Sequence, residues 1–233
     1  MRQGYSSVPA TNTMIRRMIK ETDGDHFEDL RSLEQNLTFQ AAKKEFEQCK
    51  VTFGVPQMKT LGIMNQEGIY TNVGLCCQIN VCIRLRQQFL REQLKMNFKD
   101  RREFAGSLFE QMNEAYDYID FRNQNHSTFL KLHRIDRRDY PEAAVREALL
   151  NLLVHREYSF RASSFISVYL DRIEFTSIGG LISGMTLQDV MMGISVCRNA
   201  KLANVFYRLE LIEAYGTGIR KNYGSLRGIC TKT

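Results

Sequence analysis

One stretch decides the fold of this chain: Pro141-Glu-Ala-Ala-Val-Arg-Glu147-Ala-Leu-Leu-Asn151-Leu-Leu-Val-His155. Proline is accepted in the first turn of a helix, where its missing N–H costs nothing, and the Ala and Leu residues that follow favour helix. The stretch therefore predicts a helix over 142–156. Glu147, Asn151 and His155 recur every four residues and share one face, whereas the opposite side is apolar and must be buried. A core helix that aligns these three groups indicates a site, and a merely solvated polar stripe is the alternative.

The segments around this helix predict an α+β fold. Amphipathic periodicity predicts helices over 108–121 and 200–213, and two alternating stretches within 165–177 predict a β-hairpin. We expect the helices on one face of a mixed, mostly antiparallel sheet that contains this hairpin, with a smaller α/β segment towards the N-terminus.

Polar residues mark where the helices begin. Ser107 with Glu110, and Thr186 with Asp189, have the spacing of a capping box, in which two side chains satisfy free backbone N–H groups. Asn199 is expected to cap the helix 200–213.

The most basic part of the chain lies just before the organising helix. Residues 123–127 are expected to form a polar loop, and residues 131–138 hold four cations against Asp136. Such a run can meet phosphates, but it is more often a solvated connector. The net charge of +6 is spread along the chain, which permits contact with nucleic acid and does not establish it.

Composition is that of a globular protein, with 43% hydrophobic and 25% charged residues. No apolar run is long enough to span a membrane, and the first residues lack the apolar core of a signal peptide, so we expect a cytoplasmic protein. The six cysteines show no CxxC spacing, which argues against a zinc site or a disulfide framework.

Two glycine segments follow the organising helix, Gly179-Gly180 and Gly216-Thr217-Gly218. Glycines just before a helix leave backbone N–H groups free to meet a phosphate. Each segment alone is a weak signal, because glycine also ends helices and forms turns.

Taken in order, the helix, the hairpin and the two glycine segments resemble the GHKL (Bergerat-type) superfamily of ATP-binding domains. The resemblance implies ATP and Mg²⁺ as cofactors. It implies that Glu147 activates a water molecule and that Asn151 holds the magnesium ion. Gly179 and Gly180 would lie against adenine, and the segment Gly216-Thr217-Gly218 would cover the phosphates.

One position departs from that superfamily. An Asp usually stands just before the first glycine segment, where it binds the adenine amino group, and here the corresponding residue is Ser177. A hydroxyl can hydrogen-bond adenine, but it discriminates less sharply than a fixed carboxylate.

The resemblance is closer to one branch, the RecG-related ATPase-like region. The residues that carry it are Arg146-Glu147, Asn151, His155-Arg156-Glu-Tyr158, Asp171-Arg172-Ile-Glu174, Gly179-Gly180-Leu181, Arg198-Asn199 and Tyr215-Gly-Thr-Gly-Ile219. In bacterial transcriptional regulators this region usually follows an AlbA/Schlafen-type DNA-binding domain. We therefore expect an internal piece of such a protein: the end of the AlbA-type domain at 1–12, a connecting region at 13–101, and a C-terminally truncated GHKL-like ATP-binding region at 102–233.

Residues 76–93 do not fit this branch as their neighbours do. Codons can be chosen for Cys76 to Gln93 that, when the reading frame starts at the third nucleotide, encode an amino-acid sequence typical of the family. We therefore hypothesise that this segment is translated out of frame. The family has an apolar strand here, whereas this segment carries Arg84, Arg86 and Arg91. Burying an unpaired arginine is costly, so we expect the segment to pack poorly or to turn outward.

Three functions remain open from the sequence. The first is an ATP-binding module of a bacterial DNA-binding transcriptional regulator, which would bind DNA through its other domains. The second is a degenerate GHKL-like interaction or dimerisation domain without nucleotide binding, and the third is a weak magnesium-dependent ATPase. A helicase motor is not supported, because the chain has no GxxxxGK[ST] motif. The sequence leaves open whether the protein forms a homodimer, and no membrane partner is expected.

Overall fold

The computed structural model describes residues 2–3, 6–7, 26–78, 85–90, 98–160, 162–169, 171–182, 184–194 and 196–213. The second glycine segment, Gly216-Thr217-Gly218, lies outside the described residues. Among the helices that the structure describes, none is long and apolar enough to cross a membrane.

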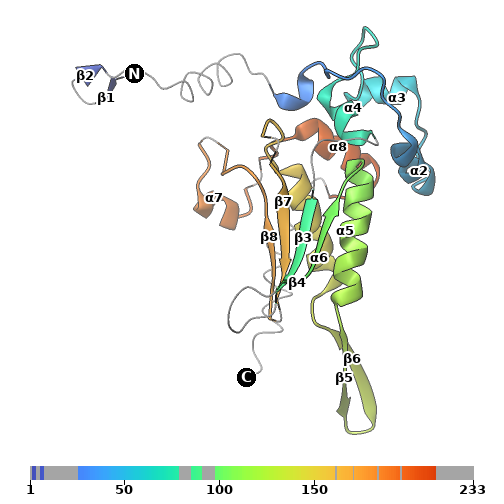
Figure 1. Cartoon of the computed structure of the whole chain (residues 1–233), viewed down its shortest axis with the longest axis vertical. Coiled ribbons are helices and arrows are strands. Elements are labelled where there is room, and N and C mark those ends of the chain that lie inside the picture. Colours follow the sequence, from blue (N-terminus) through green and yellow to red (C-terminus); the bar gives the residue numbers. More distant parts are fainter. Residues whose placement is uncertain are drawn as a thin grey trace.

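A four-stranded sheet lies at the centre of the molecule (Figure 1). Its strands follow in the order β4 (Phe98–Phe104), β3 (Leu85–Leu90), β7 (Ser164–Val168) and β8 (Ile173–Thr176). The β3–β4 and β7–β8 pairs are antiparallel, and β3 pairs with β7 in parallel. This is the mixed, mostly antiparallel sheet expected from the sequence, and the hairpin predicted within 165–177 is confirmed.

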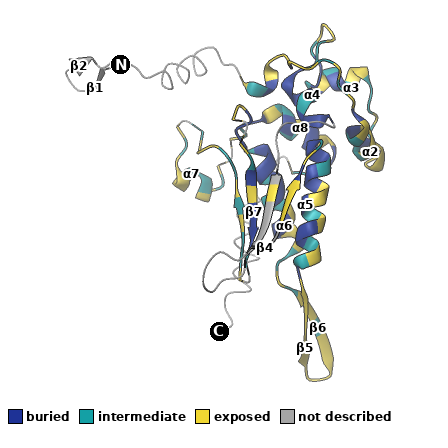
Figure 2. Ribbon diagram, in the orientation of Figure 1, coloured by how far each residue is buried: buried dark blue, intermediate teal, exposed yellow. Residues whose placement is uncertain are grey.

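Two long helices cover one face of this sheet, α5 (Leu108–Arg122) and α6 (Glu142–Val154). Both have buried apolar sides, which Figure 2 shows in dark blue, and Phe109, Leu153 and the β7 residue Ile166 are fully covered. The mixed α+β prediction is therefore confirmed. The Ser107–Glu110 capping box is present, with both reciprocal hydrogen bonds.

A layer of shorter helices packs at one end of the sheet. It contains η1 (Phe27–Asp29), α2 (Gln40–Gln48), α3 (Val55–Thr60) and α4 (Asn72–Cys77), and it lies beside α8 (Ala200–Arg208). The remaining elements are α7 (Leu187–Met191), which begins with the predicted capping box, and the short strands β1 (Arg2–Gln3) and β2 (Ser6–Ser7).

Helix α8 differs from its prediction in length and in capping. It ends at Arg208 rather than at 213, and Asn199 occupies the N-cap position without capping through its side chain. The Glu28 carboxylate instead accepts hydrogen bonds from the backbone N–H groups of Lys201 (3.0 Å) and Leu202 (3.2 Å). These are the two N–H groups that a capping side chain normally satisfies.

The Asn199 side chain has a different use. It donates hydrogen bonds to the backbone carbonyls of Val154 (2.7 Å) and Arg156 (2.8 Å), at the end of α6. Asn199 therefore joins the C-terminus of α6 to the N-terminus of α8.

A two-stranded hairpin projects from the body of the molecule (Figure 1). Its strands are β5 (Asn125–Leu130) and β6 (His133–Arg138), paired in antiparallel register from Asn125–Arg138 to Leu130–His133. The loop expected at 123–127 instead leads into β5 from Asn125, and the basic stretch 131–138 is solvated as expected but forms the turn and the second strand of this hairpin. The hairpin is exposed on both sides, so its strands lack the alternation of polar and apolar residues that marks a half-buried strand.

Candidate functional site

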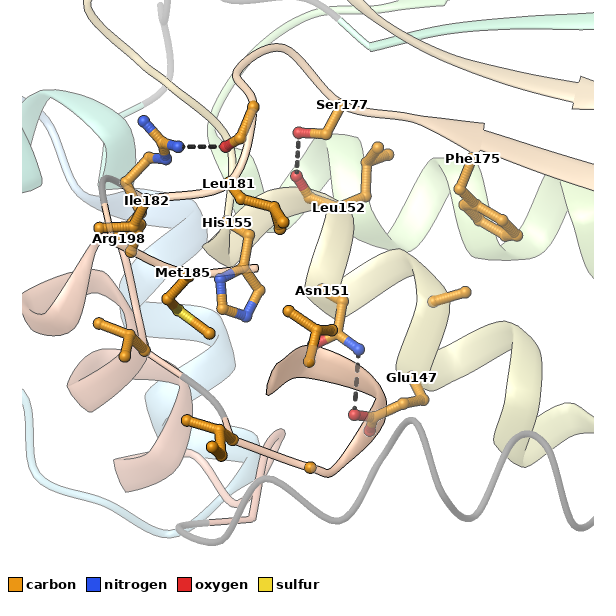
Figure 3. Close-up of a pocket in the computed structure, with 16 residues that line it drawn as sticks. Glu147, Asn151, Leu152, His155, Phe175, Ser177, Leu181, Ile182, Met185 and Arg198 are labelled. Carbon is orange, nitrogen blue, oxygen red and sulfur yellow. Dashed lines mark hydrogen bonds between the residues drawn. The ribbon is translucent and has the colours of Figure 1, made fainter. Parts of the chain in front are cut away.

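A cavity of about 430 Å³ opens between α6, the end of β8 and the segment that follows β8 (Figure 3). Its polar lining comes from Glu147, Asn151, His155, Ser177 and Arg198. The cavity brings together four of the residues predicted from the sequence, namely Glu147, Asn151, Ser177 and Gly180. Gly179 lies beside them in the chain.

The polar stripe of α6 faces this cavity, as the four-residue spacing indicated. Asn151 Nδ2 donates a hydrogen bond of 3.2 Å to Glu147 Oε1, so the two side chains are held as a pair. No hydrogen bond to Asn151 Oδ1 is formed within the described part of the chain. That oxygen is therefore available to a ligand.

His155 lies one turn beyond Asn151, where it caps the end of α6. Burial lowers the pKa of the His155 imidazole, the nearby Arg198 cation lowers it further, and the Glu147 carboxylate opposes both effects. The ring is therefore neutral near pH 7, with one nitrogen able to donate and the other able to accept a hydrogen bond.

Ser177 and Gly179 shape the turn that leaves β8. The Ser177 hydroxyl donates to the backbone carbonyl of Leu152 at 3.2 Å, which ties the end of the hairpin to α6. Gly179 has φ +105°, and a Cβ at this position would lie 2.9 Å from Glu157 Cβ. Glycine is therefore required here by the fold itself. Gly180 lines the cavity, and a Cβ at this position would meet nothing within 4 Å.

Arg198 holds the far side of the turn. Its Nη1 pairs with Glu157 Oε2 at 2.6 Å, and its Nη2 donates to the Gly180 carbonyl at 2.5 Å. Its buried Nε has no hydrogen-bond partner among the described residues. The sequence marked Arg198 as part of a motif without giving it a role, and the structure shows that it positions the glycine turn.

The rest of the lining is apolar and comes mainly from the segment around α7. The side chains concerned are those of Phe175, Leu181, Ile182, Met185, Val190, Ile194 and Val196. The sequence pattern did not predict this wall. The available signal was the density of aliphatic residues and methionines between the hairpin and α8, where the described residues include the short helix α7.

The described residues contain no group of three or more His, Cys, Asp or Glu side chains that could hold a metal ion. A metal in this cavity would therefore need oxygen ligands from a bound molecule or from water. This is the usual situation for Mg²⁺, which proteins bind through one or two side chains together with water and phosphate oxygens.

Comparison with known proteins gives two similarities. Residues 162–228 match the model of a family described as "Putative ATP-dependent DNA helicase recG C-terminal". Among solved structures, the chain is similar to the DIP2311 protein of Corynebacterium diphtheriae, with a TM-score of 0.74 and 18% sequence identity. The similarity covers 95% of this chain and 47% of that one, so this chain spans about half the length of its structural relative. No curated protein matches the chain.

The two similarities support different conclusions, one about the fold and one about the sequence of a single segment. An identity of 18% supports a common fold and no more. The family match includes the hairpin and both glycine segments but does not reach α6. The segment that closes the cavity opposite α6 is thus similar in sequence to the RecG C-terminal family, and the fold as a whole is similar to that of DIP2311.

Proposed function

We propose that this cavity binds ATP together with Mg²⁺, and that the chain is the ATP-binding, GHKL-like module of a bacterial DNA-binding transcriptional regulator. One observation carries the proposal: Glu147 and Asn151, hydrogen-bonded to each other on α6, face the same cavity as Ser177 and Gly180. The family matched by residues 162–228 is described as ATP-dependent, which supports the same ligand.

The dimensions and lining of the cavity suit a nucleotide. A volume of about 430 Å³ lies within the usual range for small-molecule sites, which are mostly apolar with a few placed polar groups. The aliphatic wall around Ile182 and Met185 offers apolar contact for a purine. Because the Ser177 proton is directed to the Leu152 carbonyl, the hydroxyl oxygen can accept a hydrogen bond from the adenine amino group.

The polar end of the cavity suits phosphates and magnesium. Asn151 Oδ1 would be a protein ligand of Mg²⁺, with the remaining ligands from phosphates and water. Bound magnesium would neutralise phosphate charge, and Glu147 would orient a water molecule next to the terminal phosphate. Gly216, Thr217 and Gly218 would supply backbone N–H groups to the phosphates.

An interaction module without nucleotide is the second candidate. It is favoured by the exposed apolar side chains of Leu187, Met191 and Met192, on and just after α7, at the outer side of the cavity wall. Such side chains are suited to contact with another protein surface.

Calorimetric titration with ATP, with and without Mg²⁺, tests the proposal on the intact natural protein. We expect magnesium-dependent binding that Asn151→Ala weakens at least about tenfold, which corresponds to about 1.4 kcal/mol. Glu147→Gln should retain binding and abolish any hydrolysis. Asn204→Ala, an exposed asparagine on α8, is the matched control and should bind normally.

Circular dichroism must first show that each variant is folded, because α6 also belongs to the core. If the wild-type protein shows no magnesium-dependent binding at millimolar ATP, the nucleotide proposal is wrong and the interaction module is favoured.

A further inference from the structure

The β5–β6 hairpin forms an arm, residues 125–138, with a local excess of positive charge that the even spread of net charge along the whole chain did not reveal. It holds Lys131, Arg134, Arg137 and Arg138 against the single carboxylate of Asp136, a net charge of +3 out of +6 for all 233 residues. The arm shares no residue with the cavity, so a role for it does not depend on nucleotide binding.

The tip of the arm is apolar and fully accessible. Phe129 is 74% exposed, Leu130 is 65% exposed, and Leu132, in the two-residue turn, is 96% exposed. A two-stranded hairpin is at best marginally stable alone, and these side chains add nothing to its packing. Their exposure at the end of a projecting element is therefore typical of a contact surface.

The base of the arm is firmly attached. Asn123 Nδ2 donates to the Tyr140 carbonyl and Tyr140 N donates to Asn123 Oδ1, each at 2.9 Å, which closes the base with a reciprocal pair. Arg138 forms ion pairs with Asp120 of α5 and with Glu142 of α6. The arm is thus held between the two central helices and presents its outer part to solvent.

The other cations of the arm differ in whether they already form ion pairs. Arg134 is paired with Asp136 at 2.7 Å, and Asp136 also accepts from Ser127. Lys131 and Arg137 are exposed, and neither forms an ion pair within the described residues. These two side chains are free to contact an anion.

We propose that the arm binds double-stranded DNA by inserting its tip into the minor groove. Lys131 and Arg137 would contact phosphates, and Phe129 and Leu132 would wedge between base pairs. Minor-groove proteins combine these two features, cations that follow the groove and apolar side chains that part a base step and bend the duplex. Two-stranded ribbons are an established way of reaching base edges.

The size and charge of the arm agree with this partner. Six residues per strand give a length of about 20 Å, comparable to the diameter of a DNA duplex. A polyanion complements the charge of the arm, whereas a second copy of this chain, itself at +6, complements it less well.

Fluorescence anisotropy with a labelled duplex of about 30 base pairs, titrated from low to physiological salt, tests the proposal. We expect Lys131→Glu with Arg137→Glu to weaken binding at least tenfold. The double variant should also reduce the slope of log affinity against log salt by about 2, since each lost phosphate contact removes about 0.9. Lys43→Glu with Lys44→Glu, on exposed positions of α2, makes the same change in net charge and should alter affinity less than about twofold.

The wedge is tested by Phe129→Ser with Leu132→Ser on a duplex labelled at both ends. We expect the energy transfer that reports bending to fall to that of free DNA, while the salt slope is retained. Both side chains are exposed, so thermal melting of the variant should match the wild type.

Three results would overturn the proposal. The wild-type protein could fail to bind the duplex even at low salt, or the arm and control variants could lose affinity equally. The tip variant could also leave DNA binding intact and convert a dimer to a monomer in sedimentation, which would make a second copy the partner of the arm.

Discussion

The contact between Glu28 and α8 allows a quantitative prediction about stability. The Glu28 carboxylate is buried and receives the N–H groups of Lys201 and Leu202, so Glu28→Ala leaves two donors unsatisfied at a covered helix end. Loss of a capping side chain costs about 1 kcal/mol, and a buried unpaired donor about 1–3 kcal/mol. We expect Glu28→Ala to lower the free energy of unfolding by about 2–4 kcal/mol. Glu28→Gln should cost about 1 kcal/mol, because its amide oxygen still accepts.

Urea unfolding at pH 7, followed by circular dichroism, measures this difference. Glu47→Ala, an exposed carboxylate on α2, is the control and should stay within about 0.5 kcal/mol of the wild type. If Glu28→Ala costs less than about 0.5 kcal/mol, or if Glu28→Gln costs as much as Glu28→Ala, the carboxylate does not act as the cap of α8.

The contribution of Glu28 to the free energy of unfolding changes with pH in a defined direction. Burial raises the pKa of the Glu28 carboxyl above its usual value, and the two backbone N–H groups offset this only in part. The folded protein therefore holds this proton more tightly than the unfolded chain does. We expect the wild type to gain stability relative to Glu28→Gln as the pH falls from 7 towards 4.5, and unfolding titrations at several pH values check this. A difference that shrinks on acidification would contradict it.

Three further expectations concern the pocket and the central strand. The lowered pKa of His155 predicts that stability is lost as the pH falls below 6.5, and that His155→Asn removes this loss in thermal melts across pH. Gly179→Ala should cost about 2–4 kcal/mol in urea unfolding because of its φ and its contact with Glu157, whereas Gly180→Ala should be nearly neutral for stability. Sequencing the gene across residues 76–93 should show codons that give an apolar strand in the shifted frame, and any other codons would end the hypothesis of a frame slip.

The helices and strands that could be predicted are those that a short-range pattern of residues determines. The α6 stripe follows from four-residue spacing on a helix with strong propensity, and the hairpin within 165–177 follows from alternation around a short turn. The sequence therefore placed Glu147, Asn151 and Ser177 on elements that the structure brings to one cavity. Gly216 belongs to a segment outside the described residues, so its role remains a prediction.

The features that were missed depend on distant residues or on solvent. Glu28 caps α8 across 173 residues of chain, and no local pattern announces such a contact. The arm was missed because a ribbon exposed on both faces has no buried side to impose alternation. Its turn also lacks the usual glycine, since Lys131 itself adopts φ +57°.

The place of Arg86 in β3 bears on the expectation that residues 76–93 pack poorly. The structure puts β3 between β4 and β7, in the interior of the sheet. Arg86 is exposed and pairs with Glu103 of β4 at 3.5 Å. This arginine is accommodated because it lies on the outer face, where water solvates the charge.

The reciprocal pair between Asn123 and Tyr140 has a mechanical consequence. It fastens the arm immediately before α6, and α6 carries the polar wall of the cavity towards its other end. If the helix and the arm moved as one rigid unit, the displacement caused by a rotation of α6 would be largest at the tip of the arm. For an arm of about 20 Å, a tilt of α6 by about 5° moves Leu132 by about 2 Å, which is half the spacing between stacked base pairs or more. A small adjustment at the cavity wall would in that case produce a larger displacement at the far end of the arm.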